Sequence, residues 1–266
     1  YDPNAQSTDI LQPPSLDHWL GTTQAGQDVF AQMMVGTRYS IFWGLLTAVI
    51  VMLVYVTIGV TAGYFGGRLD ELLSLLINVF LVLPGFPLAL IIAAYVPYKG
   101  ALTVAMVIVL TGWPGHTRIL RAQTLTMRQR DFVEAARVSG LRTWRIIFFE
   151  ILPNMVAIIA AGFVGTVLSV ILAAAGLEYL GLGDIRSVSW GSMFYWAQNG
   201  SALLQGAWWW FVPPGLGIAL LGAGLTFINL GLDEIADPRL RSLSRRLKRR
   251  QKLSKAVFRA TSVSEQ

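Results

Sequence analysis

Five long stretches without a charged side chain constrain what this chain can fold into. They are residues 39–67, 72–98, 100–117, 151–177 and 187–232. A helix needs about 20 mostly apolar residues to cross the hydrocarbon core of a bilayer. The first, second and fourth stretches each hold one such helix. The third is short but can continue into the amphipathic run after it, and the last holds one span plus an external segment. We therefore predict an all-α, polytopic membrane helical bundle with five spans.

Composition agrees with a membrane protein. Only 14% of the 266 residues are charged, whereas a soluble domain carries about 25%. The chain has no cysteine, and its two histidines, His18 and His116, are far apart, so neither thiol chemistry nor a metal site is expected. No G-x-x-x-x-G-K-[ST] phosphate-binding loop occurs. We therefore expect no cofactor, and any dependence on ATP must be supplied by another chain.

Basic residues gather in two places. Of 21 Lys and Arg, seven lie in 114–150 and ten in 233–266. In a membrane protein such clusters mark the cytoplasmic side, and this pattern argues against binding of nucleic acid. With both clusters inside, residues 1–38 and the 178–206 loop lie outside. Because an external start without a targeting segment is unusual, we expect a sixth, N-terminal span in the native protein.

Three regions follow from this topology. Residues 1–38 are an extracytoplasmic segment after the expected missing span. Residues 39–232 are the transmembrane domain, with a cytoplasmic loop at 118–153. Residues 233–266 are a basic cytoplasmic tail, which would bind the anionic headgroups of the lipid bilayer.

Two of the spans contain glycine or proline motifs. The first span ends in Gly59-x-x-x-Gly63, whose small residues let another helix approach closely. The second is interrupted by Pro84-Gly85-Phe86-Pro87, and each proline should remove a helical hydrogen bond. A broken helix at membrane depth is tolerated where it lines a cavity or is buried in protein. Pro84, Phe86 and Pro87 are therefore candidates for a pathway or gate, and the alternative is a simple kink.

The external region is rich in aromatic residues. The residues concerned are Trp190, Tyr195, Trp196, Trp208, Trp209 and Trp210. They are expected to form an aromatic belt at the membrane–water interface. Pro213-Pro214 should then open the last span, because proline suits the first turn of a helix.

One segment of the cytoplasmic loop, residues 131–154, reads DFVEAARVSGLRTWRIIFFEILPN. Glu134, Ala135, Ala136 and Arg137 are good helix formers, and Gly140 is suited to end the helix in a left-handed conformation. A second short amphipathic stretch follows, and Pro153 starts the next span. We expect two short helices that project from the membrane and offer a low-relief surface to another protein.

This segment resembles the EAA loop of permease subunits in ATP-binding-cassette (ABC) importers. The resemblance rests on E-A-A, on the glycine four residues after its last alanine, and on I-L-P before the next span. Further blocks extend the similarity to the second permease subunit of the dipeptide, oligopeptide and nickel family. They are HWLGTTQAGQDVFAQMMVGTRYSIFWG at 18–44, AGYFGG, TGWPGHTRILRAQ, EYLGLG, SWGSM and DPRLR. Thr23, Gln27, Ala31 and Gln32 depart from the first block of the family. The departures at 23 and 27 lie on the inferred outer side, so they concern the substrate more than the architecture.

The resemblance implies the permease fold of a type I ABC importer and a non-catalytic subunit of a prokaryotic cytoplasmic membrane, with its C-terminus inside. Such a subunit forms half of a pathway for oligopeptides, dipeptides or a similar solute, with oligosaccharides or nickel complexes as alternatives. The implied partners are a second homologous permease in a heterodimer, two ATPase subunits and an extracytoplasmic solute-binding protein. The coupling helix that contacts an ATPase would contain Glu134, Ala135, Ala136, Arg137, Gly140 and Leu141.

Two other functions compete with that of an importer subunit. An intramembrane hydrolase would need Ser192 and His116 to meet, but the predicted topology places them on opposite sides of the membrane. An ion-coupled secondary transporter usually carries ionisable residues within its spans, whereas the five stretches contain no Asp, Glu, Lys or Arg and a single histidine, His116. Both are less favoured than the importer subunit.

Overall fold

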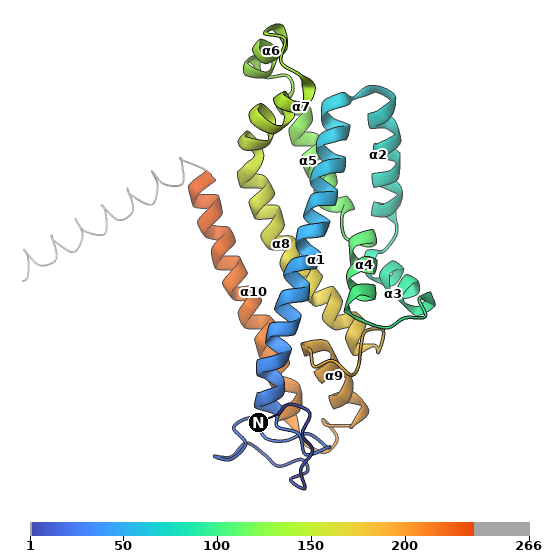
Figure 1. Cartoon of the computed structure of the whole chain (residues 1–266), viewed down its shortest axis with the longest axis vertical. Helices are drawn as coiled ribbons and strands as arrows, with labels where there is room; N and C mark the ends of the chain where they lie inside the picture. The colour runs from blue at the N-terminus through green and yellow to red at the C-terminus, as the bar shows by residue number, and fades with distance from the viewer. Residues whose placement is uncertain (1, 237–266) are drawn as a thin grey trace, which may run out of the picture.

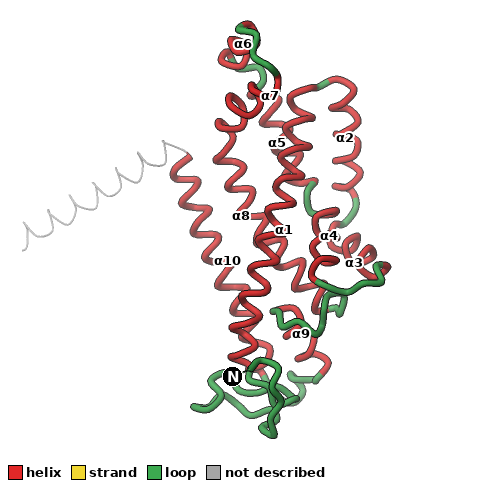
Figure 2. Tube along the Cα trace, in the orientation of Figure 1, coloured by secondary structure: helices red, strands yellow, loops and turns green. Residues whose placement is uncertain are grey.

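The protein is an elongated helical bundle (Figures 1 and 2). The structure is a computed structural model that describes residues 2–236, so most of the expected tail at 233–266 lies outside the described residues. Within this part every regular element is a helix, and the only β-type pairing is a single bridge between Thr22 and Asp28. The elements are α1 (Val29–Phe65), α2 (Gly67–Val82), α3 (Gly85–Tyr95), α4 (Ala101–Thr111), α5 (Pro114–Met127), α6 (Asp131–Val138), α7 (Thr143–Arg145), the π-helix η1 (Ile146–Ile151), α8 (Leu152–Tyr179), α9 (Trp190–Asn199) and α10 (Trp208–Ala236).

Three described helices are long and apolar enough to cross a membrane: Val29–Phe65, Thr143–Tyr179 and Trp208–Leu232. A fourth span results if α2 and α3 are one broken helix. The 11 residues of α4 are too few, because they rise only about 16 Å. The fifth span that we expected from the sequence therefore requires α4 and α5 to cross the membrane together.

The two ends of the bundle are built differently. The segment 2–28 has no helix and lies at the same end as α9, whereas α6 and α7 project at the opposite end (Figures 1 and 2). The main apolar core runs between these ends, where α1, α4, α5 and α8 pack together. A smaller cluster, which includes Val29, Met193 and Trp210, joins α1, α9 and α10 near the segment 2–28.

The Gly59-x-x-x-Gly63 motif brings α1 against α5, as its small residues predicted. A Cβ atom on Gly59 would lie 2.9 Å from the carbonyl oxygen of Thr117, and one on Gly63 would lie 2.7 Å from that of Arg121. A side chain at either position would force the two backbones apart. The glycines therefore fix the close approach of these helices.

The expected break in the second span separates α2 from α3, and the two helices are bent by 88°. Leu83 is extended, with φ −73° and ψ 132°, because a residue before proline is disfavoured in the helical region. Pro84 is extended as well, with ψ 111°. Pro87 is the third residue of α3, where its missing N–H would have no partner inside the helix. The break therefore depends on Pro84, and the prediction that each proline removes a hydrogen bond is wrong for Pro87.

Two helices begin earlier than the sequence suggested. The first begins at Val29, ten residues before Tyr39, because Asp28 caps it by accepting a hydrogen bond from the backbone N–H of Ala31 at 2.7 Å. The last begins at Trp208, so Pro213-Pro214 lies inside it rather than opening it. Tertiary contacts hold this extra turn, because Trp209 Nε1 donates to the carbonyl of Thr22 at 3.1 Å.

The aromatic residues of α9 and of the start of α10 are not all at the surface of the protein. Trp196 and Trp208 are about half exposed, but Trp190 and Trp210 are buried in the protein. Trp190 Nε1 donates to the hydroxyl of Thr37 at 3.2 Å, which ties α9 to α1. The expected aromatic belt is therefore only partly a surface feature, and the buried indoles are part of the core.

Candidate functional site

The predicted docking segment forms a projection made of α6, α7 and η1, residues 131–151, which we call the α6–α7 projection (Figure 1). Its first helix holds Glu134, Ala135, Ala136 and Arg137, and Gly140 and Leu141 follow the capping residue Ser139. All six residues predicted to contact an ATPase therefore lie in one compact turn of chain at the end of the bundle.

Gly140 ends α6 as the sequence predicted. Its φ is +77°, a left-handed conformation that glycine adopts without the penalty of a side chain. The N–H of Leu141 donates to the carbonyl of Ala136 at 3.2 Å, and the N–H of Gly140 donates to that of Arg137 at 2.9 Å. These two bonds form a Schellman motif, which satisfies carbonyls at the end of the helix. The turn thereby fixes the direction in which the chain leaves α6.

One side of α6 anchors the projection to the bundle. Val133 and Ala136 are buried and belong to the main core, and Leu141 packs against it. The guanidinium of Arg137 lies over the ring of Tyr64, 5.5 Å from its centroid, in a cation–π contact with the end of α1. These packed side chains connect α6 to the main core, so a movement of α6 would also move the core.

The other side of α6 is open. Glu134, Ala135 and Gly140 are exposed, and Val138 is 83% exposed. A Cβ atom on Gly140 would meet nothing within 4 Å. Glu134 and Arg137 form a pair at 3.6 Å across one turn, which is worth about 0–1 kcal/mol because both side chains are exposed. Trp144, Phe148 and Phe149 are also exposed, so the projection presents aromatic surface beside a low-relief helix.

The same end contains an ion pair that sequence reasoning missed. Arg121 on α5 contacts Asp70 on α2 through two hydrogen bonds, one of them 2.7 Å between Nη2 and Oδ2. Arg128 donates to the carbonyl of Tyr64 at 3.0 Å. From the sequence these arginines were only markers of the cytoplasmic side, because Asp70 is 51 residues away from Arg121. In the fold they join α5 to α2 and to the end of α1.

The break between α2 and α3 lies beside a small cavity in the bundle. Pro84, Phe86 and Pro87 are all exposed in the chain. Phe86 lines a cavity of about 220 Å³ between α3, α4, α5 and α8, which His116 and Ser169 also line. The ring of Phe86 also approaches Gly176 closely enough that a Cβ there would lie 3.0 Å from it. The break thus places an aromatic ring between α8 and a small cavity.

The structure does not bring together the residues that a hydrolase would need. His116 on α5 stacks on Tyr55 of α1 at 5.2 Å between ring centroids. Ser192 belongs to the N-terminal cap of α9, where its hydroxyl bonds the backbone N–H of Ser189 at 2.8 Å. The two residues therefore occupy elements in different parts of the bundle (Figure 1). Among the described residues no group of three or more His, Asp or Glu could hold a metal ion.

The described helices form the fold of a multi-pass membrane protein. A solved structure with the same fold is the MetNI methionine ABC transporter in its inward-facing conformations. The TM-score is 0.64 at 13% identity, over 78% of this chain and 97% of the other. At this identity the likeness concerns the fold alone.

The chain belongs to the family of binding-protein-dependent transport system inner membrane components, whose pattern matches residues 55–242. It is similar to the dipeptide transport system permease protein DppC of Bacillus subtilis, with 37% identity over 86% of this chain and 71% of that protein. The oligopeptide transport system permease protein OppC of the same organism is 35% identical over 86% and 74%. The probable D,D-dipeptide transport system permease protein DdpC of Escherichia coli is 32% identical over 90% and 80%.

Proposed function

We propose that this subunit forms half of the translocation pathway of an ATP-driven importer of short peptides in a prokaryotic cytoplasmic membrane. The names of two similar proteins, which concern dipeptides and oligopeptides, support the choice of substrate over oligosaccharides and nickel complexes. A second, homologous permease completes the pathway as a heterodimer. Two ATPase subunits bind on the cytoplasmic side, where the C-terminus also lies, and a solute-binding protein delivers the peptide outside.

The α6–α7 projection carries the coupling part of this proposal. It is open on one side of α6 and anchored to the core on the other through Val133 and Ala136. An ATPase that binds the open side and moves on binding ATP would push η1 and α8 together with α6, because these elements are in contact. Pro84 and Phe86 are the proposed moving part of the pathway. Only a difference in the affinity of ATP for the two states can drive such a switch.

A charge on the open side of α6 tests both parts of the proposal in one experiment. We expect Val138→Asp to leave the fold intact, because the side chain is 83% exposed and such surface changes alter stability by only about 0.5 kcal/mol. It should nevertheless weaken ATPase binding by at least about tenfold, because a charge would be buried unpaired at the contact. The matched control is Leu204→Asp, at a residue 90% exposed in the turn after α9.

The measurements are co-purification of the ATPase and ATP-dependent uptake of a labelled tripeptide by the complex in proteoliposomes. The wild type and Leu204→Asp should show both, and Val138→Asp should lose both. Full co-purification and uptake with Val138→Asp would contradict the coupling role of α6. A wild-type complex that takes up nickel or an oligosaccharide but no peptide would contradict the substrate.

A further inference from the structure

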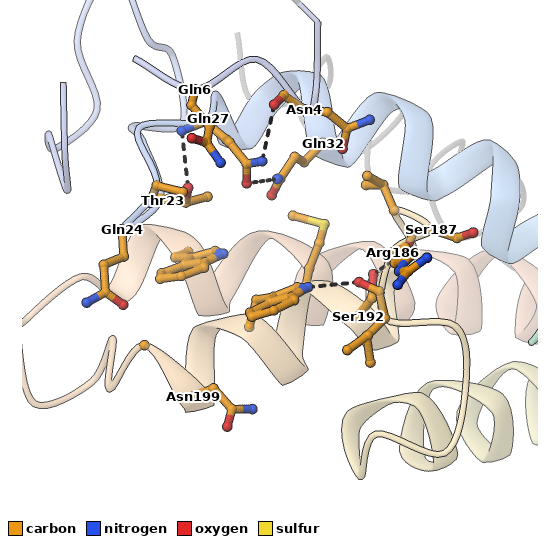
Figure 3. A pocket seen from close by; sticks show the side chains of 17 residues that line it. Asn4, Gln6, Thr23, Gln24, Gln27, Gln32, Arg186, Ser187, Ser192 and Asn199 are labelled. Carbon is orange, nitrogen blue, oxygen red and sulfur yellow. Dashed lines mark hydrogen bonds between the residues drawn. The ribbon is translucent and has the colours of Figure 1, made fainter. Parts of the chain in front are cut away.

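A cavity of about 520 Å³, lined by both polar and apolar side chains, lies beside α9 at the end of the bundle opposite α6 (Figure 1). Figure 3 shows the side chains that line it. Its walls come from the segment 2–28, the 185–188 loop, α9 and the start of α10. The volume falls in the range of small-molecule sites, about 300–1,000 Å³. Six of the 17 lining residues carry a side-chain amide: Asn4, Gln6, Gln24, Gln27, Gln32 and Asn199. Gln32 Nε2 donates to Gln27 Oε1 at 2.9 Å, so part of this amide wall is already paired. An amide both donates and accepts hydrogen bonds, so this wall suits a ligand that itself carries amide groups.

The charge of the cavity is positive. Arg186 is the only charged side chain among the lining residues, and no ion pair within residues 2–236 includes it. The nearby carboxylate of Asp184, which is not among the lining residues, accepts hydrogen bonds from the hydroxyl of Ser187 at 2.7 Å and from the backbone N–H of Arg186. The hydrogen bond from Ser187 is the main reason that the pKa of Asp184 lies below its ordinary value, and the charge of Arg186 contributes in the same direction. Because a guanidinium pairs best with a carboxylate, the cavity is suited to an anionic group.

One lining residue, Trp210, carries a buried donor without a partner among residues 2–236. Trp210 is 4% exposed, and its Nε1–H has no acceptor in the described part of the chain. Two other tryptophans at this end do have acceptors. Trp196 Nε1 donates to the carbonyl of Ile185 at 2.9 Å, and Trp209 Nε1 donates to the carbonyl of Thr22 at 3.1 Å. A buried N–H without a partner is unfavourable and calls for an explanation. An acceptor on a bound ligand would supply it.

We propose that this cavity binds a free short peptide, with the terminal carboxylate at Arg186 and peptide carbonyls at Trp210 and the amide wall. The buried Met193 and the half-exposed Trp196 add apolar surface for a peptide side chain. The inference deepens the proposed function and rests on it, because it places a peptide site on the outer side of this subunit. A loop of the solute-binding protein is the competing occupant, because an Asp or Glu on such a loop would also pair with Arg186. The experiments below distinguish the two occupants.

The first test compares two probes on the assembled complex in lipid nanodiscs, without the solute-binding protein. Trialanine should bind at least about tenfold more tightly than trialanine amide, because only the former offers a carboxylate to Arg186. Arg186→Gln should remove this preference. Arg118→Gln, at an exposed arginine on α5, is the matched control and should keep it.

The second test separates a binding role of Trp210 from a structural one. Trp210→Phe keeps an aromatic ring and removes the unpaired N–H, but it also removes part of a buried ring, so the melting temperature of the complex should fall modestly. Affinity for trialanine should fall by about three- to tenfold. Trp208→Phe, at an exposed residue of the same helix, should change neither quantity. A loss of stability with unchanged affinity in Trp210→Phe would make the residue structural and contradict the proposal.

Two results would overturn the cavity as a peptide site. One is a wild-type complex that imports peptide normally but binds no trialanine up to about 10 mM, which is weaker than any specific site of this kind. The other is an Arg186→Gln complex that binds trialanine normally but binds the solute-binding protein more weakly, which would make the cavity a docking site for that protein. Absence of peptide uptake by the wild type would instead contradict the proposed function itself.

Discussion

At the scale of single residues, the conformation of Gly140 leads to a prediction with an internal control. Its φ of +77° disfavours any side chain, although a Cβ would meet no atom within 4 Å. Gly140→Ala should therefore destabilise the turn by about 1–2 kcal/mol. Gly115 on α5 also has open space around it but lacks a positive φ, so Gly115→Ala should stabilise its helix by about 0.5–1 kcal/mol. Melting temperatures of the complex should shift in opposite directions, and equal shifts would show that the left-handed turn does not matter.

At the scale of elements, the bend between α2 and α3 leads to a prediction about two prolines. Pro84 keeps Leu83 extended, whereas Pro87 occupies a position where its missing N–H would have no partner. Pro84→Ala should let α2 and α3 straighten and should lower uptake per assembled complex by at least about tenfold, if the bend is a moving part of the pathway. Pro87→Ala is the control and should change uptake by less than about twofold. Unchanged uptake per complex in Pro84→Ala would make the break a passive kink.

At the scale of the whole molecule, the two ends of the bundle should lie on opposite sides of the membrane. The chain has no cysteine, so single cysteines report their own position without background. We expect Leu204→Cys, near α9, to react with a membrane-impermeant maleimide on intact cells, because the positive-inside rule places the basic loop at 114–150 inside. Val138→Cys on α6 should react only after lysis. The reverse pattern would invert the topology and would also contradict the proposed site of ATPase docking.

The sequence by itself determined the features that depend on neighbouring residues. Stretches without charge predict spans because a charged group is costly in hydrocarbon, and three apolar spans with a broken pair are present. The left-handed turn at Gly140 and the break at Pro84 follow from the backbone preferences of glycine and proline. The EAA segment and the matching blocks indicated the permease family, which the comparisons confirmed.

Only the tertiary structure decided which distant groups meet. The pair of Arg121 and Asp70 joins residues 51 positions apart, and the cavity beside α9 is assembled from the segment 2–28, the 185–188 loop, α9 and α10. It also decided that Trp190 and Trp210 are buried while Trp208 is exposed. The physical reason is that lipid and protein interior are equally apolar, so the composition of a membrane helix does not reveal which face packs on protein. Those contacts depend on the path of the chain in space, which no local pattern encodes.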